Sequence, residues 1–253
     1  MKKVEFVTIF TTYGKLDVVK QTLPSVVEET KREPKAALIV MDTTEDPERE
    51  TKWRWLQDNY GDTDDVFLMF TSNTSLAIAR NTCLHLAQEM YMPEFICMID
   101  DDHGYQTGLI LDMMVAMDRY YGEVAPNGLR FGLFTGCNVH RNGKRCKLDG
   151  HLYPDSDNQP GALGGTNGCF RCAPTRHWNN VLKGYEVDEY LISYYQSRSM
   201  STRNYNRGYT TMIVNGGDGC FFVENEGRGD STKEKLRWDD RYTASDKRAD
   251  FKR

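Results

Sequence analysis

The stretch of sequence that decides the fold is FICMIDDDH, residues 95–103. Its first five residues form a continuous apolar run, which is typical of a strand buried on both faces of a parallel sheet. Three consecutive aspartates, Asp100 to Asp102, follow the run directly. Adjacent carboxylates repel one another unless a cation or water lies beside them. The stretch therefore predicts a buried strand that ends in an acidic loop.

The rest of the first half alternates short apolar runs with segments in which apolar residues recur three and four positions apart. The apolar runs lie at residues 4–10, 36–41, 66–70 and 95–99, and the helical segments at 16–27, 76–90 and 109–121. Pro24 is expected to kink or break the first helix. This alternation indicates βαβ units around a mostly parallel sheet. The ligand crevice of such a sheet lies beyond the carboxyl ends of its strands.

The second half of the sequence is less regular. Glycine, asparagine and short polar stretches dominate residues 122–168, and the segments that favour strands are 131–135, 211–214 and 221–223. The chain is highly charged from Gly227 onward. Because we find neither an internal repeat nor a clear linker, we expect one domain over residues 1–253.

Composition narrows the function further. The 253 residues carry 32 Lys plus Arg against 37 Asp plus Glu, a net charge of −5, and 39% are hydrophobic. These values exclude a disordered chain or a small disulfide scaffold, and the acidic balance argues against a nucleic-acid partner. No apolar run approaches the roughly 20 residues that span a bilayer, and the early charges do not fit a signal peptide. We expect a soluble protein with reduced cysteines in the cytoplasm, or in the host cytoplasm if the source is viral.

The acidic loop has two interpretations on its own. Hard divalent cations bind oxygen ligands, and Asp100 and Asp102 point the same way if the strand continues. An acidic loop that caps the next helix is the alternative. Upstream, Arg80 lies in the first turns of a predicted helix, where it suits a diphosphate or the acidic cluster itself. Asp42 follows the second strand, where it could bind a base or ribose or form a plain Asx-turn.

Together these pieces resemble a GT-A type nucleotide-diphospho-sugar glycosyltransferase of the family 2 group. The resemblance runs in order through VTIFTTYGKLDVVKQTLPSV (7–26), ALIVMDTTED (37–46), SLAIARN (75–81) and FICMIDDDH (95–103). It covers about the first 105 residues. It implies a Rossmann-like, mostly parallel central sheet flanked by helices, with a less regular acceptor-binding C-terminal half. The implied parts are a nucleotide-sugar-binding half at 1–105, an acceptor-binding half at 106–230 and a charged tail at 231–253.

The resemblance also implies an activity and a donor site. The activity is metal-dependent, inverting transfer of a hexosyl group from a nucleotide-diphosphate sugar, with a UDP-sugar favoured, to a hydroxyl of a glycan or other acceptor. The residues implied at the nucleotide sugar are Thr11, Tyr13, Asp42, Arg80, Asp100 and Asp101. Asp100 and Asp102 would form the Asp-x-Asp motif that holds Mn²⁺ or Mg²⁺, with Asp102 in direct contact.

The acceptor site is implied by later residues. The glycine-rich GGTNGCF (164–170) and the helix after it would border the acceptor through Gly165, Thr166 and Trp178. Either Asp188 or Glu189 would be the general base that deprotonates the acceptor hydroxyl, although the pair also suits an ordinary acidic helix start. Many relatives use a C-terminal histidine as a metal ligand, and this chain has none after His177. The candidates to replace it are Glu224, Asn225 and Glu226, unless two carboxylates and phosphates hold the metal alone.

Three alternatives stay open. A sugar-1-phosphate nucleotidyltransferase has a similar sheet, but it usually opens with a glycine-rich phosphate loop that Thr11 to Gly14 do not supply. A non-catalytic carbohydrate-binding protein on the same fold would bind no nucleotide. A four-thiolate zinc site could use Cys137, Cys146, Cys169 and Cys172, of which only the last two are spaced as a tight pair.

Overall fold

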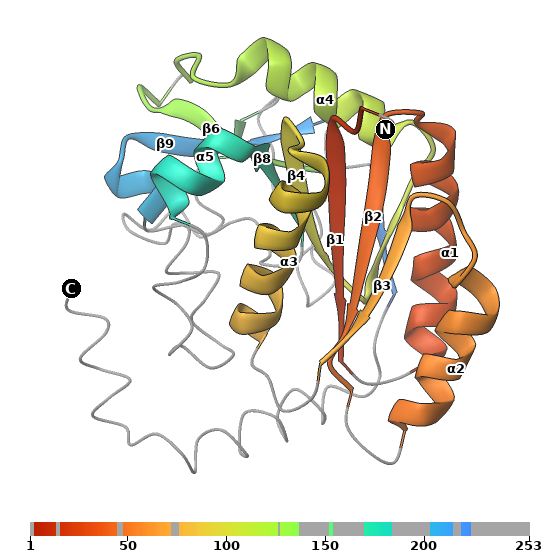
Figure 1. The fold of residues 1–253 in the computed structure, drawn as a ribbon. Coiled ribbons are helices and arrows are strands. Elements are labelled where there is room, and N and C mark those ends of the chain that lie inside the picture. The colour runs from red at the N-terminus through yellow and green to blue at the C-terminus, as the bar shows by residue number, and fades with distance from the viewer. Residues whose placement is uncertain are drawn as a thin grey trace.

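A mixed sheet of eight strands forms the centre of the molecule (Figure 1). The computed structural model describes residues 3–13, 16–44, 48–71, 76–125, 127–136, 152–153, 170–183, 203–214 and 219–223. The strands are β1 (Phe6–Thr12), β2 (Ala36–Asp42), β3 (Val66–Phe70), β4 (Phe95–Asp100), β6 (Arg130–Thr135), β7 (Leu152–Tyr153), β8 (Phe170–Pro174) and β9 (Tyr209–Ile213). Their order across the sheet is β3-β2-β1-β4-β8-β6-β9-β7.

The sheet has a parallel half and a mixed half. Strands β3, β2, β1 and β4 run parallel, whereas β8 lies antiparallel between β4 and β6. β6 and β9 are parallel to each other, and β7 pairs antiparallel with β9. A separate two-stranded sheet joins β5 (His103–Tyr105) to β10 (Cys220–Phe222). The carboxyl ends of the four parallel strands therefore meet along one edge.

Helices cover both faces of the sheet. They are α1 (Leu16–Arg32), α2 (Arg49–Tyr60), α3 (Leu76–Tyr91), α4 (Leu109–Tyr120) and α5 (Thr175–His177), which continues into the π-helical turn η1 (Trp178–Leu182). The core against one face includes residues of α1, α2 and α4, and the core against the other includes residues of α3 and η1. Figure 1 shows α3 on the near side of the sheet. None of the described helices is long and apolar enough to cross a membrane.

Strand β1 shows why the parallel strands have continuous apolar sequences. All seven of its residues are buried. Phe6 and Phe10 belong to the core shared with α1, while Val7 and Ile9 belong to the core shared with α3. Because both faces are covered, a strand here gains burial from every side chain, and polar alternation is absent.

The predicted strands at 4–10, 36–41, 66–70, 95–99, 131–135, 211–214 and 221–223 are all confirmed, with bounds that shift by at most two residues. Of the kink or break expected at Pro24, the break does not occur, because α1 continues from Leu16 to Arg32. Proline removes one backbone donor from a helix. Here Leu23, Val26 and Val27, on both sides of Pro24, are buried against the sheet, and that packing carries the helix through.

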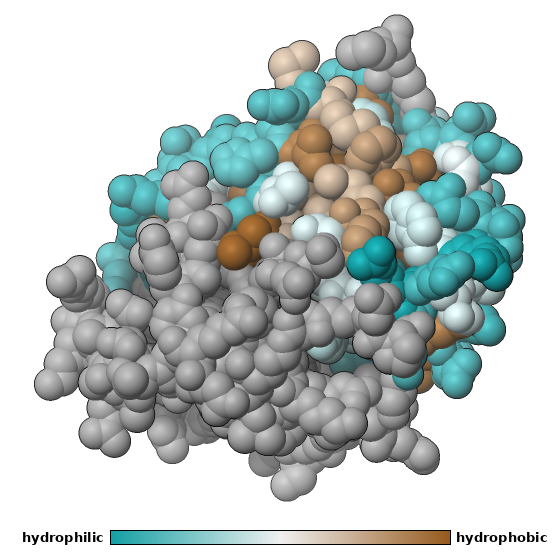
Figure 2. Space-filling view, turned by 60° about the horizontal axis from the view of Figure 1, so that its bottom comes forward, coloured by the Kyte–Doolittle hydropathy of each residue, from teal (hydrophilic) through white to brown (hydrophobic). Residues whose placement is uncertain are grey.

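The surface of the described residues is not uniformly polar. Figure 2 shows hydrophilic side chains around an apolar area on one face of the molecule. The large apolar side chains that are exposed include Phe67 on the edge strand β3, Ile78 on α3, and Leu111 and Val115 one turn apart on α4. Isolated apolar residues of this kind are normal at protein surfaces.

Candidate functional site

The candidate site lies where β1, β2 and β4 end. Thr12 stands beside Asp42 in the register of β1 and β2, and Thr11 stands beside Asp100 in the register of β1 and β4. Three parallel strands thus deliver polar side chains to one edge, which is where an α/β sheet binds ligands. This is the edge at which the alternation of strands and helices in the sequence predicts a ligand crevice.

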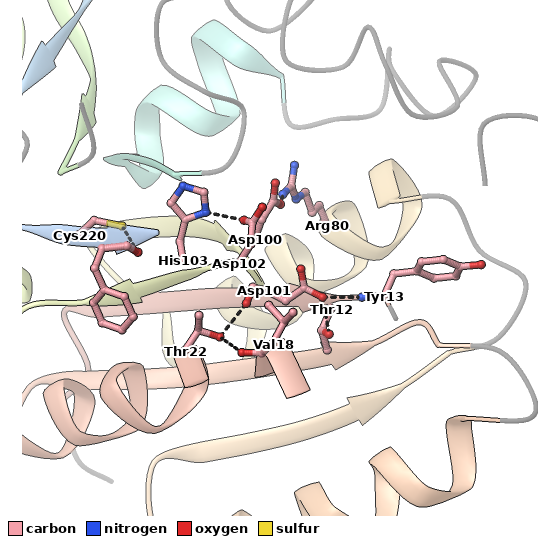
Figure 3. A network of polar contacts seen from close by, with 11 residues as sticks. Thr12, Tyr13, Val18, Thr22, Arg80, Asp100, Asp101, Asp102, His103 and Cys220 are labelled. Carbon is pink, nitrogen blue, oxygen red and sulfur yellow. Dashed lines mark hydrogen bonds and ion pairs between the residues drawn. The ribbon is translucent and has the colours of Figure 1, made fainter. Parts of the chain in front are cut away.

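The acidic stretch is a turn and not a continuing strand. β4 ends at Asp100, Asp101 and Asp102 form a turn, and β5 begins at His103. The Val223 amide, just after β10, donates a 2.9 Å hydrogen bond to the Asp102 carbonyl. In Figure 3 the side chains of Asp100 and Asp102 lie on one side of the turn and Asp101 on the other. The predicted common direction of Asp100 and Asp102 therefore arises through a turn.

Asp100 is paired with Arg80, which projects from α3. The Arg80 Nη2 donates to Asp100 Oδ1, and Nε lies 3.4 Å from Thr11 Oγ1. Arg80 is almost fully buried, whereas the Asp100 side chain retains 13% exposure. A guanidinium is the cation best suited to hold a carboxylate at such a buried site. Of the two partners predicted for Arg80, the structure brings it to the acidic cluster.

Asp101 anchors the turn from inside the protein. Its Oδ2 accepts hydrogen bonds from the Thr12 hydroxyl at 2.8 Å and from the Tyr13 amide at 3.1 Å. Its carbonyl accepts a 2.6 Å bond from the Thr22 hydroxyl on α1. Desolvation raises the pKa of Asp101, and the nearby charge of Lys52 and the two hydrogen bonds oppose that rise. The side chain is committed to holding the turn in place.

Asp102 is held by its neighbour. Its Oδ1 lies 2.5 Å from His103 Nδ1, and His103 is wholly buried. The Asp102 side chain keeps 14% exposure. A histidine that binds a carboxylate in this way fixes the direction of its oxygen atoms. Asp100 and Asp102 are thus two oriented carboxylates that stay partly exposed where β4 ends.

Asp42 carries the most informative contact of the site. Its Oδ1 accepts bonds from the Thr44 amide at 3.0 Å and the Thr44 hydroxyl at 2.6 Å, and lies 3.3 Å from Lys52 Nζ. Its Oδ2 is buried and has no hydrogen-bond partner within the described protein. The Asx-turn expected as one alternative is present, but it uses only one of the two oxygens. A buried carboxylate oxygen without a donor is costly and calls for an explanation.

Lys52 is a functional candidate that the sequence analysis missed. It projects from α2, is 1% exposed, and belongs to a helix that apolar spacing did not predict. Only Lys52 and Leu56 are buried on α2. Their spacing of four, with a lysine in place of an apolar residue, was the available signal, and it is weak.

The remaining predicted residues divide between the core and the undescribed parts. Thr11 is buried and Tyr13 half-buried at the end of β1. Trp178 is fully buried, and its indole donates to the Ile96 carbonyl at 3.1 Å, so the structure places it in the core rather than at an acceptor surface. Gly165, Thr166, Asp188, Glu189, Glu224, Asn225 and Glu226 lie outside the described residues.

No group of three or more metal-binding side chains occurs among the described residues. Of the four cysteines considered for zinc, Cys172 lies buried on β8 directly opposite Cys97 on β4. Cys137, Cys146 and Cys169 fall outside the described ranges. Among the described residues, the predicted metal ligands are Asp100 and Asp102, and two carboxylates with substrate phosphates are a usual ligand set for a hard divalent cation.

No protein-family model matches this sequence, and no curated protein matches it. Solved structures do match. TarS of S. aureus (residues 1–349) superposes with a TM-score of 0.56 at 15% identity, over 83% of this chain and 58% of TarS. Its complex with UDP-GlcNAc gives 0.56 at 13% identity, over 89% and 60%. The mannosyltransferase PcManGT from Pyrobaculum calidifontis, in complex with GDP-Man and Mn²⁺, gives 0.53 at 15% identity, over 91% and 60%.

At this level of identity the matches show the fold. It is the GT-A fold of nucleotide-sugar glycosyltransferases, as the sequence predicted. The chain spans about three fifths of the length of these structures.

Proposed function

We propose that the chain is a metal-dependent, inverting glycosyltransferase that transfers a hexosyl group from a nucleotide-diphosphate sugar, preferably a UDP-sugar, to an acceptor hydroxyl. The observation that carries the proposal is the Asp42 carboxylate. Its Oδ2 is buried without a donor at the edge where the parallel strands end. An N–H of a base or an O–H of a ribose would supply the missing bond, and the GT-A fold binds such ligands in the complexes of TarS and PcManGT.

The diphosphate end of the donor would lie at the acidic turn. Asp102, oriented by His103, and Asp100, held by Arg80, would hold Mn²⁺ or Mg²⁺ together with the phosphates. When bound, the metal ion would neutralise charge on the leaving diphosphate. Tyr13 and Thr11 stand beside this turn at the end of β1, so the nucleotide would lie across the ends of β1, β2 and β4.

Asp188 or Glu189 would act on the acceptor. Its carboxylate would take the proton of the acceptor hydroxyl while that oxygen bonds to the anomeric carbon and the bond to the diphosphate breaks. A single displacement of this kind inverts the anomeric carbon. Gly165 and Thr166 would border the acceptor. A carboxylate placed here would distinguish an enzyme from a carbohydrate-binding protein on the same fold.

Isothermal titration with UDP-GlcNAc, GDP-mannose and CDP, each with and without Mn²⁺, tests the donor site. We expect one nucleotide sugar to bind only with Mn²⁺. Asp42→Asn should weaken that binding by roughly tenfold or more, because the amide cannot accept as the charged oxygen does. Asp58→Asn, an exposed aspartate on α2, is the matched control. The proposal fails if none of these ligands binds, or if Asp42→Asn and Asp58→Asn behave alike.

Release of the nucleotide diphosphate in the presence of acceptors tests the catalytic carboxylates. We expect that either Asp188→Asn or Glu189→Gln lowers kcat by about 10²–10⁴-fold with donor binding unchanged, and that the other variant has a smaller effect. The variant with the larger loss identifies the base. Wild-type rates in both variants would favour the non-catalytic alternative.

A further inference from the structure

Lys52 connects two carboxylates that belong to different strands. Its ammonium donates to the Thr12 hydroxyl at 2.6 Å and to the Thr44 hydroxyl at 2.8 Å. Thr12 in turn donates to Asp101 Oδ2 at 2.8 Å, and Thr44 donates to Asp42 Oδ1 at 2.6 Å. One buried cation therefore reaches the end of β2 through one threonine and the acidic turn after β4 through the other.

The direction of every proton in this bridge is determined. A lysine ammonium can only donate, so each threonine hydroxyl accepts from Lys52 and must send its single proton to a carboxylate. The two arms are alike: ammonium to hydroxyl to carboxylate. Such a chain of charge-assisted bonds is stronger and shorter than neutral bonds and fixes the groups that it joins.

The bridge is buried, so the charge of Lys52 has to be balanced within the protein. Lys52 and Asp42 are 1% and 0% exposed, and Thr12 and Thr44 are 1% and 2% exposed. A buried ammonium is tolerated only when its charge is matched by nearby anions. Lys52 meets that condition by sharing its charge between Asp42 and, through Thr12, Asp101. A side chain needed only for packing at this position of α2 would be apolar, like Leu56 one turn later.

We propose that Lys52 is a positioning residue that fixes the separation between the nucleoside end of the donor site, at Asp42, and its diphosphate end, at the acidic turn. The inference rests on the proposed function, because it assigns the two ends to one nucleotide. Lys52 itself touches neither end of the ligand. It holds the two ends at a fixed distance before the ligand arrives. A nucleotide that binds at one end then finds the groups of the other end already in position.

Hydrogen exchange in the protein without ligand tests the bridge directly. The Thr44 amide is bonded to Asp42 Oδ1 and the Tyr13 amide to Asp101 Oδ2, so each reports one arm. Lys52→Met should accelerate exchange at both amides by about tenfold or more. Thr44→Val should act mainly at residue 44, and Thr12→Val mainly at Tyr13. Lys35→Met, an exposed lysine paired with Glu5 at the opposite end of β2, is the control and should change neither.

Titration with UMP alone and with UDP plus Mn²⁺ supplies the second measurement. Lys52→Met should lower the affinity for both ligands by about tenfold or more. Thr44→Val should lower mainly the affinity for UMP. Thr12→Val should lower mainly the increase in UDP affinity that Mn²⁺ causes. If Lys52→Met does not fold, the two valine variants decide, and equal effects on both arms overturn the proposal. Wild-type binding by Lys52→Met overturns the role of Lys52 alone. If the wild type binds neither these nucleotides nor the nucleotide sugars titrated for the donor site, the proposed function itself is overturned.

Discussion

At the scale of the residue, the three adjacent aspartates have different surroundings because their side chains leave the turn in different directions. Asp101 turns inward to Thr12, while Asp100 and Asp102 stay partly exposed beside a guanidinium and an imidazole. The repulsion expected from three adjacent carboxylates is relieved by separation and by partners. One aspartate holds the turn, and the other two keep part of their side chains exposed.

Asp102→Asn should therefore remove the effect of Mn²⁺ on UDP binding and leave the fold intact. The amide keeps the shape of the side chain but loses the charge that a divalent cation needs. Titration of UDP with and without Mn²⁺, with circular dichroism as the check on folding, measures this. Asp118→Asn on the exposed side of α4 is the matched control. A full effect of Mn²⁺ in Asp102→Asn would contradict the assignment.

His177 should make the stability of the protein depend on pH. Its Nδ1 lies 3.2 Å from the Tyr121 hydroxyl and its Nε2 2.9 Å from Asn204 Oδ1, and it is wholly buried. Burial lowers the pKa of His177 to about 4. The unfolded chain binds the proton first as the pH falls, so stability is complete above the ordinary histidine pKa of about 6.5 and is lost progressively between about pH 6.5 and 4. The loss should reach about 3 kcal/mol.

Denaturant unfolding at pH 7.5 and pH 4.5 checks this expectation. His177→Gln removes the titrating group and keeps an amide that can bond Asn204. The variant should be less stable than the wild type at pH 7.5, because the packing against Tyr209 is lost, but it should lose less stability between the two pH values. An equal loss in both proteins would show that other groups cause the pH dependence.

At the scale of the element, the pairing of β5 with β10 fixes the acidic turn from its far side. Gly104 is central to this pairing. A Cβ there would lie 2.1 Å from the Phe221 ring and 2.6 Å from Ser25 Oγ on α1. The Val223–Asp102 hydrogen bond continues the same pairing. Only glycine lets β10 and α1 approach β5 this closely.

Gly104→Ala should accordingly separate β10 from β5. We expect a loss of about 1–3 kcal/mol in unfolding free energy, which is the usual cost of overpacking, together with weaker binding of UDP and Mn²⁺. Gly104→Ala with Phe221→Leu should recover part of the loss, because the smaller side chain yields space. Denaturant unfolding of both single variants and the double variant measures the interaction. Additive losses would contradict the contact.

The sequence predicted the elements that depend on local pattern and missed those that depend on distant partners. The buried strands can be predicted from continuous apolar runs, as in β2 and β4. Helix α2 buries only Lys52 and Leu56, so it has almost no apolar spacing to detect. Strand β5 has three residues and exists because β10, more than a hundred residues later, pairs with it. Its register cannot be derived from either segment alone.

In the candidate site, too, the sequence predicted what depends on local pattern and missed what depends on contacts between separate elements. Thr11, Asp42, Arg80 and Asp100 do converge at one edge, because strand order fixes where strand ends meet. The inward turn of Asp101 depends on Thr12 and Thr22, and the role of Lys52 depends on Asp42 and Thr44. These are contacts between separate elements, and no spacing within the chain encodes them.

At the scale of the whole molecule, β8 joins the two halves of the sheet at the site. Phe170 at its start pairs with Ile99, next to Asp100. The chain therefore enters β8 at the same edge as the acidic turn. The donor site that we propose in the parallel half and the acceptor site that we propose in the following half would meet at this edge.

Buried cysteines in the described part of the chain can report whether this sheet opens as one unit. Cys83 on α3, Cys97 on β4, Cys172 on β8 and Cys220 on β10 are all buried. Burial raises the pKa of Cys83 to about 12 and also raises the pKa of Cys172. Because the thiolate is the reactive form, neither thiol should react in the folded state at pH 8. Alkylation of Cys97 and Cys172, which face each other across β4 and β8, requires those strands to separate.

Iodoacetamide labelling at pH 8, followed by mass spectrometry, should therefore modify Cys97 and Cys172 at one common slow rate. When opening is fast relative to labelling, that rate follows the population of the open form. A ligand at about 100 times its dissociation constant stabilises the folded state by about 2.7 kcal/mol, so UDP with Mn²⁺ at that excess should slow both rates by about 100-fold. Asp42→Asn, titrated at the same ligand concentration, should lose most of this protection. Different rates at Cys97 and Cys172 would show that β8 leaves the sheet by itself, and the two halves would then not act as one cooperative body.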